Sequence, residues 1–327
     1  MYKTNFHQTD LSNLTFLVTG GAGFIGSNLV EYLLQFGAKK VKVIDNLSTG
    51  FIKNIEPFKA HSKFEFIEAD ICDYENCLKG LDGVDYVSHQ AALGSVPRSI
   101  ETPIKTNQSN VDGFLNVITA AREKGVKRIV YASSSSVYGD VPSLPKVESK
   151  IGNPLSPYAV SKYTNELYAK VAHLNYSQAL VGLRYFNVFG PRQSPQGAYA
   201  AVIPLFIEAL LKNESPFING DGNQSRDFTF VENAVQANIK ALFTENEKAF
   251  GEAFNVAVGE RFTLLELYDL IQQKVGASAT AIHREERAGD IKDSLADISK
   301  AEKLMGYQPT VRFQDGIDKT IKWFKQQ

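Results

Sequence analysis

A glycine-rich segment near the N-terminus most strongly limits the fold that this chain can adopt. Gly20, Gly23 and Gly26 in LVTGGAGFIGSNL follow an apolar run at residues 16–19 and open a helical pattern at residues 24–36. Glycines at this spacing allow a tight turn, a close approach of the backbone to a pyrophosphate, and close packing of a helix on a sheet. The free N–H groups at the start of such a helix also favour phosphate. Because a glycine triplet can equally be an ordinary turn, its surroundings decide the interpretation.

The surrounding pattern indicates a parallel sheet. Helical patterns, including one at residues 106–123, alternate with strand-like runs at residues 41–44, 64–67, 85–88, 128–132 and 180–184. Alternation of this kind predicts βαβ units whose helices cover both faces of the sheet. The sequence therefore predicts an α/β fold with a Rossmann-type, doubly wound parallel sheet.

An acidic residue ends the predicted second strand. Asp45 follows the glycines by about 20 residues, where a carboxylate can accept a hydrogen bond from a ribose 2′-hydroxyl and would repel a 2′-phosphate. NAD is therefore favoured over NADP as the cofactor. The alternative for Asp45 is an ordinary helix or loop cap.

The second half of the chain has a different texture. A loop-rich stretch after Gly190 is followed by a helical pattern at residues 202–211 and a turn-rich strand pair in FINGDGNQSRDF, and short helices are expected at residues 264–274, 299–305 and 313–325. We therefore predict an NAD-binding domain at residues 1–186, with a return segment near residues 228–260. A smaller, interleaved α/β substrate domain is predicted at residues 187–327.

Composition disfavours several classes of partner and site. The net charge of -1 gives no electrostatic reason to expect nucleic acid or an anionic membrane. Cys72 and Cys77 are too few for a disulfide framework or a four-thiolate metal site, and the five histidines lack metal-ligand spacing. The N-terminus has no apolar signal core, and no apolar run approaches the ~18 residues of a membrane span. We expect a soluble, cytoplasmic protein that binds no metal.

A tyrosine and a lysine one helical turn apart form a second candidate site. Tyr158 and Lys162 in SPYAVSK share a helix face, and Ser156 with Pro157 suits the start of that helix. A free phenol has a pKa of about 10 and is a poor base, but a nearby ammonium and a positively charged nicotinamide would favour the phenolate. Serines at residues 133–136, expected at the carboxyl edge of the sheet, can supply a hydroxyl donor. The alternative is an ordinary capped helix beside a serine-rich loop.

These motifs resemble those of a known family. GGAGFIG, HQAA at residues 89–92, YASSSSVYGD at 131–140, PYAVSK at 157–162 and LRYFNVFGPR at 183–192 are similar to the extended short-chain dehydrogenase/reductases that act on nucleotide sugars. ALGSVPRSI at 92–100, GAYAAVIP at 197–204 and INGDGNQSRDF at 218–228 resemble, more narrowly, the UDP-N-acetylhexosamine 4-epimerases. The likeness covers nearly the whole chain.

The resemblance implies roles for individual residues around NAD. Tyr158 is the base, Lys162 tunes it, and Ser134 hydrogen-bonds the sugar O4. Asp70 and Ile71 resemble the place where an adenine amino group is held. The full set of implied cofactor contacts is Gly20, Gly23, Phe24, Ile25, Gly26, Asp45, Asn46, Ser48, Thr49, Gly50, Asp70, Ile71, Gln90, Ala91, Ala92, Thr106, Tyr158, Lys162 and Tyr185.

The resemblance also implies a UDP-sugar site in the second domain. Arg226 and Arg287 match phosphate-contacting arginines, and Asn187 resembles a side chain that holds the diphosphate or the sugar. The implied substrate contacts are Gly94, Ser95, Ser134, Ser135, Ser136, Asn187, Tyr199, Ala200, Ala201, Val202, Phe217, Asn219, Arg226, Arg287, Asp290 and Ser294.

The implied reaction is a redox-neutral 4-epimerisation. Tyr158 takes the proton of the sugar 4-hydroxyl as hydride passes from C4 to NAD⁺, the 4-keto sugar turns, and the hydride returns to its other face. Ser294 stands before ADISK, where enzymes limited to UDP-glucose and UDP-galactose carry a bulky tyrosine. We therefore expect UDP-GlcNAc and UDP-GalNAc as substrates, with UDP-glucose and UDP-galactose as further ones, for the supply of polysaccharide or lipopolysaccharide sugars.

Other functions compete with this interpretation. A 4-epimerase of UDP-N-acetylhexosaminuronic acid is one alternative, because Arg98 could face a C6 carboxylate. A dehydratase or decarboxylase would need an acid/base pair, typically Asp–Glu, where this chain has Ser135 and Ser136. A non-catalytic NAD sensor would have no need of Tyr158, Lys162 and Ser134 together.

The helix that begins at Pro157 has two candidate buried faces. Small residues on the side of Tyr158 can press against the sheet, and they are Ser161, Ala169 and Ala172. An apolar stripe lies roughly opposite and consists of Val160, Tyr163, Leu167, Val171 and Leu174. The resemblance implies a homodimer through a four-helix bundle, formed by this stripe and the helix at residues 111–121. The alternative is burial of the stripe within the same chain.

Overall fold

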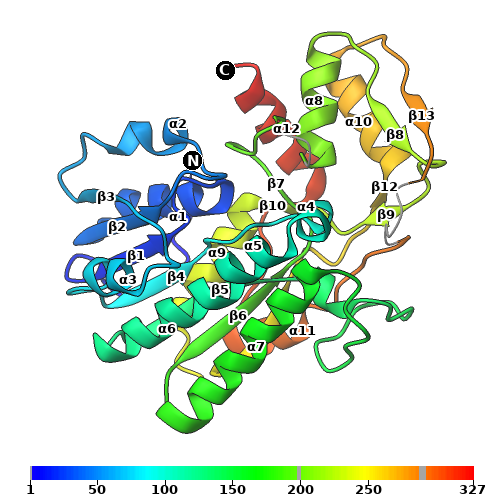
Figure 1. Ribbon diagram of the computed structural model, residues 1–327. Helices are drawn as coiled ribbons and strands as arrows, with labels where there is room; N and C mark the ends of the chain where they lie inside the picture. The colour runs from blue at the N-terminus through cyan, green and yellow to red at the C-terminus, as the bar shows by residue number, and fades with distance from the viewer. Residues whose placement is uncertain (1, 197–199, 287–291) are drawn as a thin grey trace.

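Strands buried on both sides form the centre of the molecule. In a computed structural model, which describes residues 2–196, 200–286 and 292–327, seven strands form one sheet in the order β11-β6-β5-β4-β1-β2-β3 (Figure 1). All of its neighbouring strands are parallel. The predicted Rossmann-type fold is confirmed. The strands are β1 (Thr15–Thr19), β2 (Lys40–Asp45), β3 (Phe64–Glu68), β4 (Tyr86–His89), β5 (Arg128–Ser134), β6 (Leu180–Tyr185) and β11 (Glu252–Val256).

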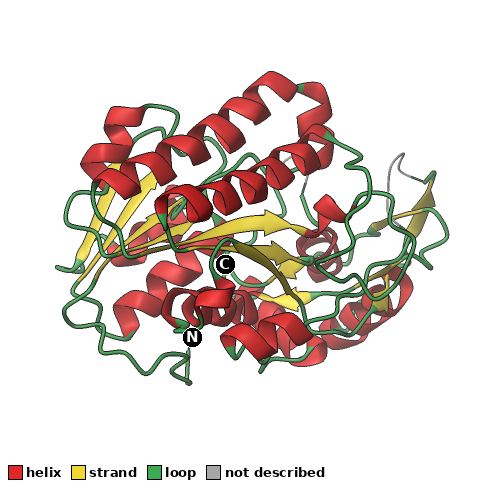
Figure 2. Ribbon diagram, turned by 90° about the horizontal axis from the view of Figure 1, so that it is seen from below, coloured by secondary structure: helices red, strands yellow, loops and turns green. Residues whose placement is uncertain are grey.

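Helices cover the sheet on both faces, as Figure 2 shows. Because side chains alternate along a strand, Phe16 and Val18 of β1 pack into one apolar core while Leu17 packs into another. The first core is completed by α1 (Phe24–Gln35), α9 (Val231–Phe243) and α11 (Ser299–Met305). The second is completed by α3 (Tyr74–Gly80), α6 (Gly113–Glu123) and α7 (Pro157–Tyr176).

The start of α7 follows the predicted capping pattern. The Ser156 hydroxyl accepts a hydrogen bond from the Ala159 N–H at 3.1 Å, and Pro157 is the first helical residue. This cap satisfies one of the N–H groups that a helix start leaves without a partner. The helix ends at Ser177, whose φ of 55° is left-handed. Tyr158 therefore lies in the first turn of a long helix.

The predicted helix at residues 106–123 is interrupted. It consists of α5 (Pro103–Asn107), a π-helical segment at Gln108–Asp112, and α6. The wider segment contains the buried Asn110, whose amide accepts from the Leu93 N–H at 2.8 Å and donates to the Ser161 hydroxyl at 3.0 Å. The chain is therefore helical throughout the predicted range, and the π-helical segment is the feature that periodicity did not predict.

A third apolar core lies beside the sheet, at the upper right of Figure 1. It involves α8 (Val202–Leu211), α10 (Leu264–Val275) and α12 (Phe313–Phe324). Three short strand pairs accompany these helices: β7 (Val188–Phe189) with β10 (Thr229–Phe230), β8 (Phe217–Asn219) with β13 (Ile282–Arg284), and β9 (Ser225–Arg226) with β12 (Phe262–Thr263).

The strand pair predicted within residues 217–228 is wrong. β8 and β9 both exist, but β8 pairs with β13 and β9 pairs with β12. Gly220 and Gly222 adopt positive φ angles of 70° and 81°. Asp221, which lies between them, accepts a hydrogen bond from the Asn223 N–H. These turns direct the chain away from a hairpin.

Two elements from beyond residue 186 return to the large sheet, where α9 packs on one face and β11 pairs with β6. The domain division at residue 186 stays a prediction. The remaining short helices are α2 (Ile52–Ile55), α4 (Val96–Glu101) and three 3-10 segments at Glu56–Phe58, Ser135–Tyr138 and Glu247–Ala249. Within the part of the chain that the structure describes, no helix is both long and apolar enough to cross a membrane.

Candidate active site

A cleft of about 630 Å³ lies at the carboxyl ends of the sheet strands. β1 pairs with β2 on one side and with β4 on the other, and the strand order reverses between β1 and β4. A ligand crevice forms at such a reversal because the connections leave the strand ends in opposite directions. The glycine loop and Tyr158 both line this cleft.

The glycine loop lies at the floor of the cleft. Gly20 has a φ of 68°, and a Cβ there would lie 2.6 Å from the Ala91 backbone nitrogen. A Cβ on Gly26 would overlap the Gly20 carbonyl oxygen. α1 begins after Gly23 without a side-chain cap, so its first N–H groups are available to an anion. This cradle fits the pyrophosphate of a dinucleotide.

Asp45 lies at the end of β2 and is buried. Its carboxylate accepts hydrogen bonds from the Ala22 N–H at 3.0 Å and the Leu47 N–H at 2.8 Å. Burial raises the pKa of Asp45, and these two N–H groups oppose the rise. A Cβ on Gly50 would lie 2.9 Å from both carboxylate oxygens, so Gly50 leaves the carboxylate open toward the cleft. Asp45 is thus a loop cap and a cleft-lining carboxylate at once, which fits a ribose hydroxyl.

A second carboxylate lines the cleft after β3. Asp70 accepts from the Asn46 side-chain amide at 2.9 Å and from the Cys72 N–H at 2.8 Å. Although burial opposes the effect, these hydrogen bonds lower the pKa of Asp70. The buried Ile71 packs under this turn. The pair lies where the resemblance places the adenine.

Tyr185 and Gln90, which line the cleft, are hydrogen-bonded to each other and to Asn238. Tyr185 donates from its hydroxyl to the Gln90 side-chain oxygen at 3.2 Å and accepts from the Asn238 amide at 2.7 Å. Gln90 also donates to the Asn238 oxygen at 3.0 Å. Tyr185 and Gln90, two predicted cofactor contacts, therefore form one rigid group on the cleft wall.

Tyr158, Lys162 and Ser134 converge on one wall of the cleft. Tyr158 and Lys162 come from the first turns of α7, and Ser134 is the last residue of β5. β5 is longer than predicted, so the serine run does not simply follow it: Ser134 ends the strand and caps a 3-10 turn by accepting from the Ser136 N–H at 3.1 Å. The Ser136 hydroxyl donates to Ser134 Oγ at 2.9 Å.

The charge relationship within this group differs from the prediction. We expected Lys162 to lower the pKa of Tyr158, but burial raises the pKa of Tyr158 and the Ser134 hydroxyl is the group that opposes the rise. The Lys162 ammonium lies 6.0 Å from the Tyr158 ring centroid and donates instead to the Ala132 carbonyl at 2.7 Å. Burial lowers the pKa of Lys162 to about 8. Ser134, rather than Lys162, therefore favours the phenolate among the protein's own groups.

The structure gathers most of the predicted site residues in this cleft. Besides the residues described above, the cleft is lined by the predicted residues Phe24, Ile25, Ser48, Thr49, Ala92, Gly94, Asn187, Ala200 and Ala201. The predicted residues Tyr199, Arg287 and Asp290 lie outside the described residues.

Nine predicted residues are described but do not line the cleft. Arg226, for example, donates to the Ser225 carbonyl at 2.9 Å, and Phe217 lies 3.1 Å below the Arg284 guanidinium. Their assignment stays a prediction. The nine are Ser95, Thr106, Ser135, Ser136, Val202, Phe217, Asn219, Arg226 and Ser294.

Two further residues line the cleft at the end of the FGPR motif and were not predicted from the sequence. Gln193 lines the cleft, donates to the Val188 carbonyl at 3.0 Å, and has a buried side-chain oxygen without a partner among the described residues. Arg192 lines the cleft as well and pairs with Glu31 of α1 at 2.7 Å. Both lie within three residues of Gly190, so their position beyond the sixth strand was the available signal.

Comparison with known proteins agrees with this geometry. Residues 16–257 match the model of the NAD dependent epimerase/dehydratase family. The chain belongs to this family. NAD is accordingly its cofactor, and the glycine cradle, Asp45 and Asp70 are the residues that fit it.

Members of the family resemble the chain over nearly its full length. It is 41% identical to a UDP-N-acetylglucosamine 4-epimerase from Methanobrevibacter ruminantium M1, solved with UDP-N-acetylmuramic acid, with a TM-score of 0.91 and 96% and 99% of the two chains covered. A UDP-glucose 4-epimerase from Thermotoga maritima, solved with UDP-glucose, is 34% identical with a TM-score of 0.90 and the same coverage of 96% and 99%. A UDP-glucose 4-epimerase from Mycolicibacterium smegmatis is 38% identical, covering 94% of this chain and 98% of the other.

Proposed function

We propose that this chain is an NAD-dependent 4-epimerase of UDP-hexoses whose preferred substrates are UDP-GlcNAc and UDP-GalNAc. The observation that carries the proposal is the convergence of Tyr158, Lys162 and Ser134 on the cleft that contains the glycine cradle. The similarity to UDP-sugar 4-epimerases over nearly the whole chain supports it.

The residues of the cleft divide the chemistry between them. Ser134 orients the sugar 4-hydroxyl, and Tyr158 receives its proton. Lys162 is held in place by the Ala132 carbonyl and, with a pKa of about 8, can exchange a proton near neutral pH. When bound, NAD would supply the hydride acceptor for the sugar C4 and a positive charge that favours the phenolate. The Tyr158 proton returns to O4 in the second half of the reaction, so no net oxidation occurs.

The residues after Ser134 favour epimerisation over elimination. A dehydratase needs an acid and a base next to the sugar C5 and C6, whereas Ser135 and Ser136 occupy the corresponding positions here. The Ser136 hydroxyl is engaged with Ser134 Oγ at 2.9 Å. This short contact supports a role in orienting the Ser134 hydroxyl rather than in moving a proton from the substrate.

The substrate end of the cleft has room for a substituent on the sugar. Gly94, Ala200 and Ala201 line it, and a Cβ on Gly94 would meet nothing within 4 Å. Small residues leave space for an N-acetyl group at C2. Arg98 also lines the cleft, which makes a 4-epimerase of UDP-N-acetylhexosaminuronic acid the second candidate.

We also propose that the chain forms a homodimer through α7. Val160, Leu167, Val171 and Leu174 are 51%, 49%, 49% and 70% exposed, so burial within the same chain is excluded for this stripe. The small residues Ser161, Ala169 and Ala172 on the other face are buried against the sheet, as predicted. Exposed apolar surface of this extent on a helix is typical of a subunit interface.

The expected contribution of the neighbouring helix needs a correction. Val111, Phe114, Ile118 and Ala121 are buried inside this chain, so they are not available to a second subunit. The exposed Ile104 of α5 lies beside a hollow that Val160 also lines. We therefore place the second helix of the interface at α5.

The proposal is tested by incubating the purified protein with UDP-GlcNAc, UDP-glucose or UDP-N-acetylglucosaminuronic acid, each alone, and following the anomeric protons by NMR. We expect UDP-GalNAc to form fastest, without added NAD because the cofactor is regenerated in each cycle. Fastest turnover of the uronic acid would support the second candidate. A stable 4-keto-6-deoxy sugar would contradict epimerisation.

A further inference from the structure

Helix α7 is tied to β5 by three contacts that follow one another along the strand. Ala132, Ser133 and Ser134 are consecutive residues of β5. Their partners on α7 are Lys162, Glu166 and Tyr158, which lie four residues apart on one helix face. Tyr158 and Lys162 belong to the proposed chemistry, whereas Glu166 does not line the cleft and has no assigned role in it.

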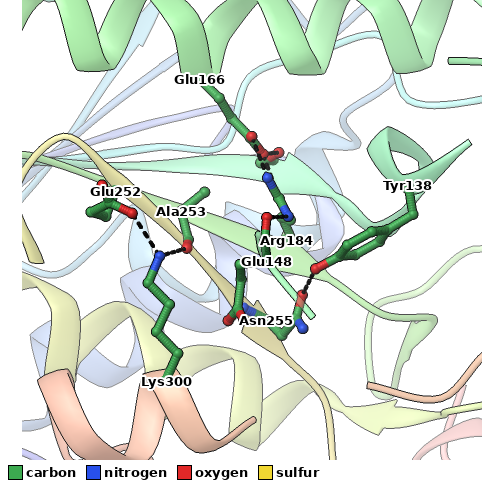
Figure 3. A network of polar contacts seen from close by, with 9 residues as sticks. Tyr138, Glu148, Glu166, Arg184, Glu252, Ala253, Asn255 and Lys300 are labelled. Atoms are coloured by element: carbon green, nitrogen blue, oxygen red, sulfur yellow. Dashed lines mark hydrogen bonds and ion pairs between the residues drawn. The ribbon is translucent and has the colours of Figure 1, made fainter. Parts of the chain in front are cut away.

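Glu166 is nevertheless the most completely bonded of the three. Its carboxylate accepts from the Ser133 hydroxyl at 2.5 Å, from Arg184 Nε at 2.9 Å and from Arg184 Nη2 at 2.7 Å. Glu166 and Arg184 are only 8% and 3% exposed in this pair. Figure 3 shows Glu166 reaching from α7 toward Arg184 on the sheet.

The sheet side of this ion pair is itself fixed. The Arg184 guanidinium lies 4.9 Å from the Tyr138 ring centroid and donates to the Glu148 carbonyl at 3.1 Å. Tyr138 donates to Asn255 of β11 at 2.6 Å (Figure 3). Asn255 donates in turn to the Asp297 carbonyl at 2.8 Å. Arg184 is therefore a rigid fork, and a carboxylate that binds it bidentately can take only one position.

A buried ion pair of this kind is weak evidence for stability, because desolvation offsets much of the attraction. Its directional contacts instead specify where the helix lies. We propose that Glu166, with Arg184 and Ser133, is a positioning residue that sets the height and rotation of α7 on β5, so that Tyr158 faces Ser134. The inference depends on the proposed function only in taking Tyr158 as the base.

The consequence for catalysis follows from the geometry of the helix. Glu166 is two turns from Tyr158 on a continuous helix, so a shift at Glu166 is carried to Tyr158 almost undiminished. A displacement of about 1 Å at a reacting group can cost up to ~100-fold in rate. Glu166 itself does not line the cleft, so its replacement should change KM little.

Ser133→Ala is the decisive variant, because it removes one contact and leaves the Glu166–Arg184 charges in place. We expect kcat to fall on the order of tenfold with KM within about twofold of the wild-type value. The acid limb of the kcat profile should move to higher pH, because Tyr158 loses part of its contact with Ser134, the group that favours the phenolate.

Glu166→Gln distinguishes a role in positioning Tyr158 from a direct electrostatic effect on the pKa of Tyr158. This change leaves the Arg184 charge unpaired, and an extra positive charge acting through space would move the acid limb to lower pH. Positioning predicts the opposite direction, the same as for Ser133→Ala. A shift of both variants to higher pH supports the inference, and a shift of Glu166→Gln to lower pH contradicts it. If Glu166→Gln does not fold, Ser133→Ala decides alone.

Thr244→Val is the matched control. The buried Thr244 hydroxyl makes two hydrogen bonds, donating to the Leu304 carbonyl at 3.0 Å and accepting from the Asn246 N–H at 3.2 Å, but it lies outside the cleft lining. Thr244→Val should lower the melting temperature as Ser133→Ala does, but it should leave the pH dependence of kcat unchanged. Equal effects of the two variants on the profile would overturn the inference.

A readout without substrate keeps this inference apart from the proposed function. The Tyr158 phenol can be titrated by NMR of protein labelled at tyrosine Cζ, with its resonance assigned by loss in Tyr158→Phe. A higher titration midpoint in Ser133→Ala supports positioning even if no UDP-sugar turns over. An unchanged midpoint together with normal epimerisation would sink the inference while the proposed function stands.

Discussion

The Lys162 ammonium points at the Ala132 carbonyl oxygen, 2.7 Å away, and not at the Tyr158 hydroxyl. Lys162 therefore anchors α7 to the carboxyl end of β5, one helical turn after Tyr158. With 1% of its surface exposed, Lys162 is an uncommonly buried lysine, and burial is what lowers its pKa. The proposed base lies on a helix that is fixed on its sheet side.

Tyr158→Phe should abolish epimerisation and leave cofactor binding intact. The phenol is the proposed proton acceptor, and a phenyl ring keeps the same packing. We expect kcat to fall by at least ~10²-fold, as is typical for the loss of a general base. NMR of UDP-GlcNAc turnover measures the loss, and the NAD content of the purified variant is its control. Near-normal activity would show that Tyr158 is not the base and is only part of the helix start.

Gly20→Ala should impair both folding and NAD binding. Its positive φ costs an alanine about 1–2 kcal/mol, and the new Cβ would also collide with the Ala91 backbone. Gly37→Ala is the matched control, because Gly37 has a φ of 83° and open space around it. Thermal unfolding should show a loss of stability in both variants. Titration with NAD should show a loss of affinity in Gly20→Ala alone. Equal NAD affinity in the two variants would contradict the assignment of the glycine loop as the pyrophosphate-binding site.

Asp227 should make stability depend on pH. Burial raises its pKa to about 6, although the Val258, Ala296 and Gly259 N–H groups oppose the rise. Because the folded pKa lies above the unfolded value of 3.8, the contribution to stability is complete below pH 3.8 and is lost as pH rises through 6. A shift of this size corresponds to on the order of 3 kcal/mol.

Asp227→Asn tests this linkage. The difference in the free energy of unfolding between wild type and variant should shrink between pH 3.8 and 6, measured by urea denaturation at several pH values. The variant should also be less stable overall, because an amide cannot accept all three N–H groups. A difference that stays constant with pH would rule out titration of Asp227 in this range.

Replacement of Leu167 and Val171 by Asp should yield a monomer. Both side chains are exposed on the α7 stripe, and two buried like charges at a symmetric interface would be repelled by their copies. Light scattering after gel filtration measures the mass. Leu205→Asp on α8, where the side chain is also exposed, should leave the dimer intact. A wild-type protein that is already monomeric would contradict the proposed interface.

Ser294→Tyr should shift the substrate preference away from UDP-GlcNAc. Ser294 is buried next to Ser225, to whose carbonyl its N–H donates at 3.1 Å, and the resemblance implies a tyrosine at this position in enzymes limited to UDP-glucose and UDP-galactose. We expect kcat/KM for UDP-GlcNAc to fall by ~10-fold or more relative to UDP-glucose. Ser294→Ala should leave the ratio unchanged. An unaltered ratio in Ser294→Tyr would show that this position does not gate the pocket.

Local sequence was sufficient for the elements that depend on neighbouring residues. The glycine spacing, the Ser156–Pro157 helix start and the alternation of strands and helices each predicted the structure that forms, because turn geometry, capping and burial act over a few residues. The strand pair at residues 217–228 failed, since strand partners are chosen by distant segments: β8 pairs with β13 and β9 with β12.

The sequence by itself determined the Rossmann sheet, the dinucleotide loop and the shared helix face of Tyr158 and Lys162. Only the tertiary structure decided what these side chains contact. It turned Lys162 toward Ala132, gave Glu166 the Arg184 fork, and left the α7 stripe exposed. The physical reason is that helical spacing specifies which residues share a face, whereas burial and hydrogen-bond partners depend on which strand that face meets.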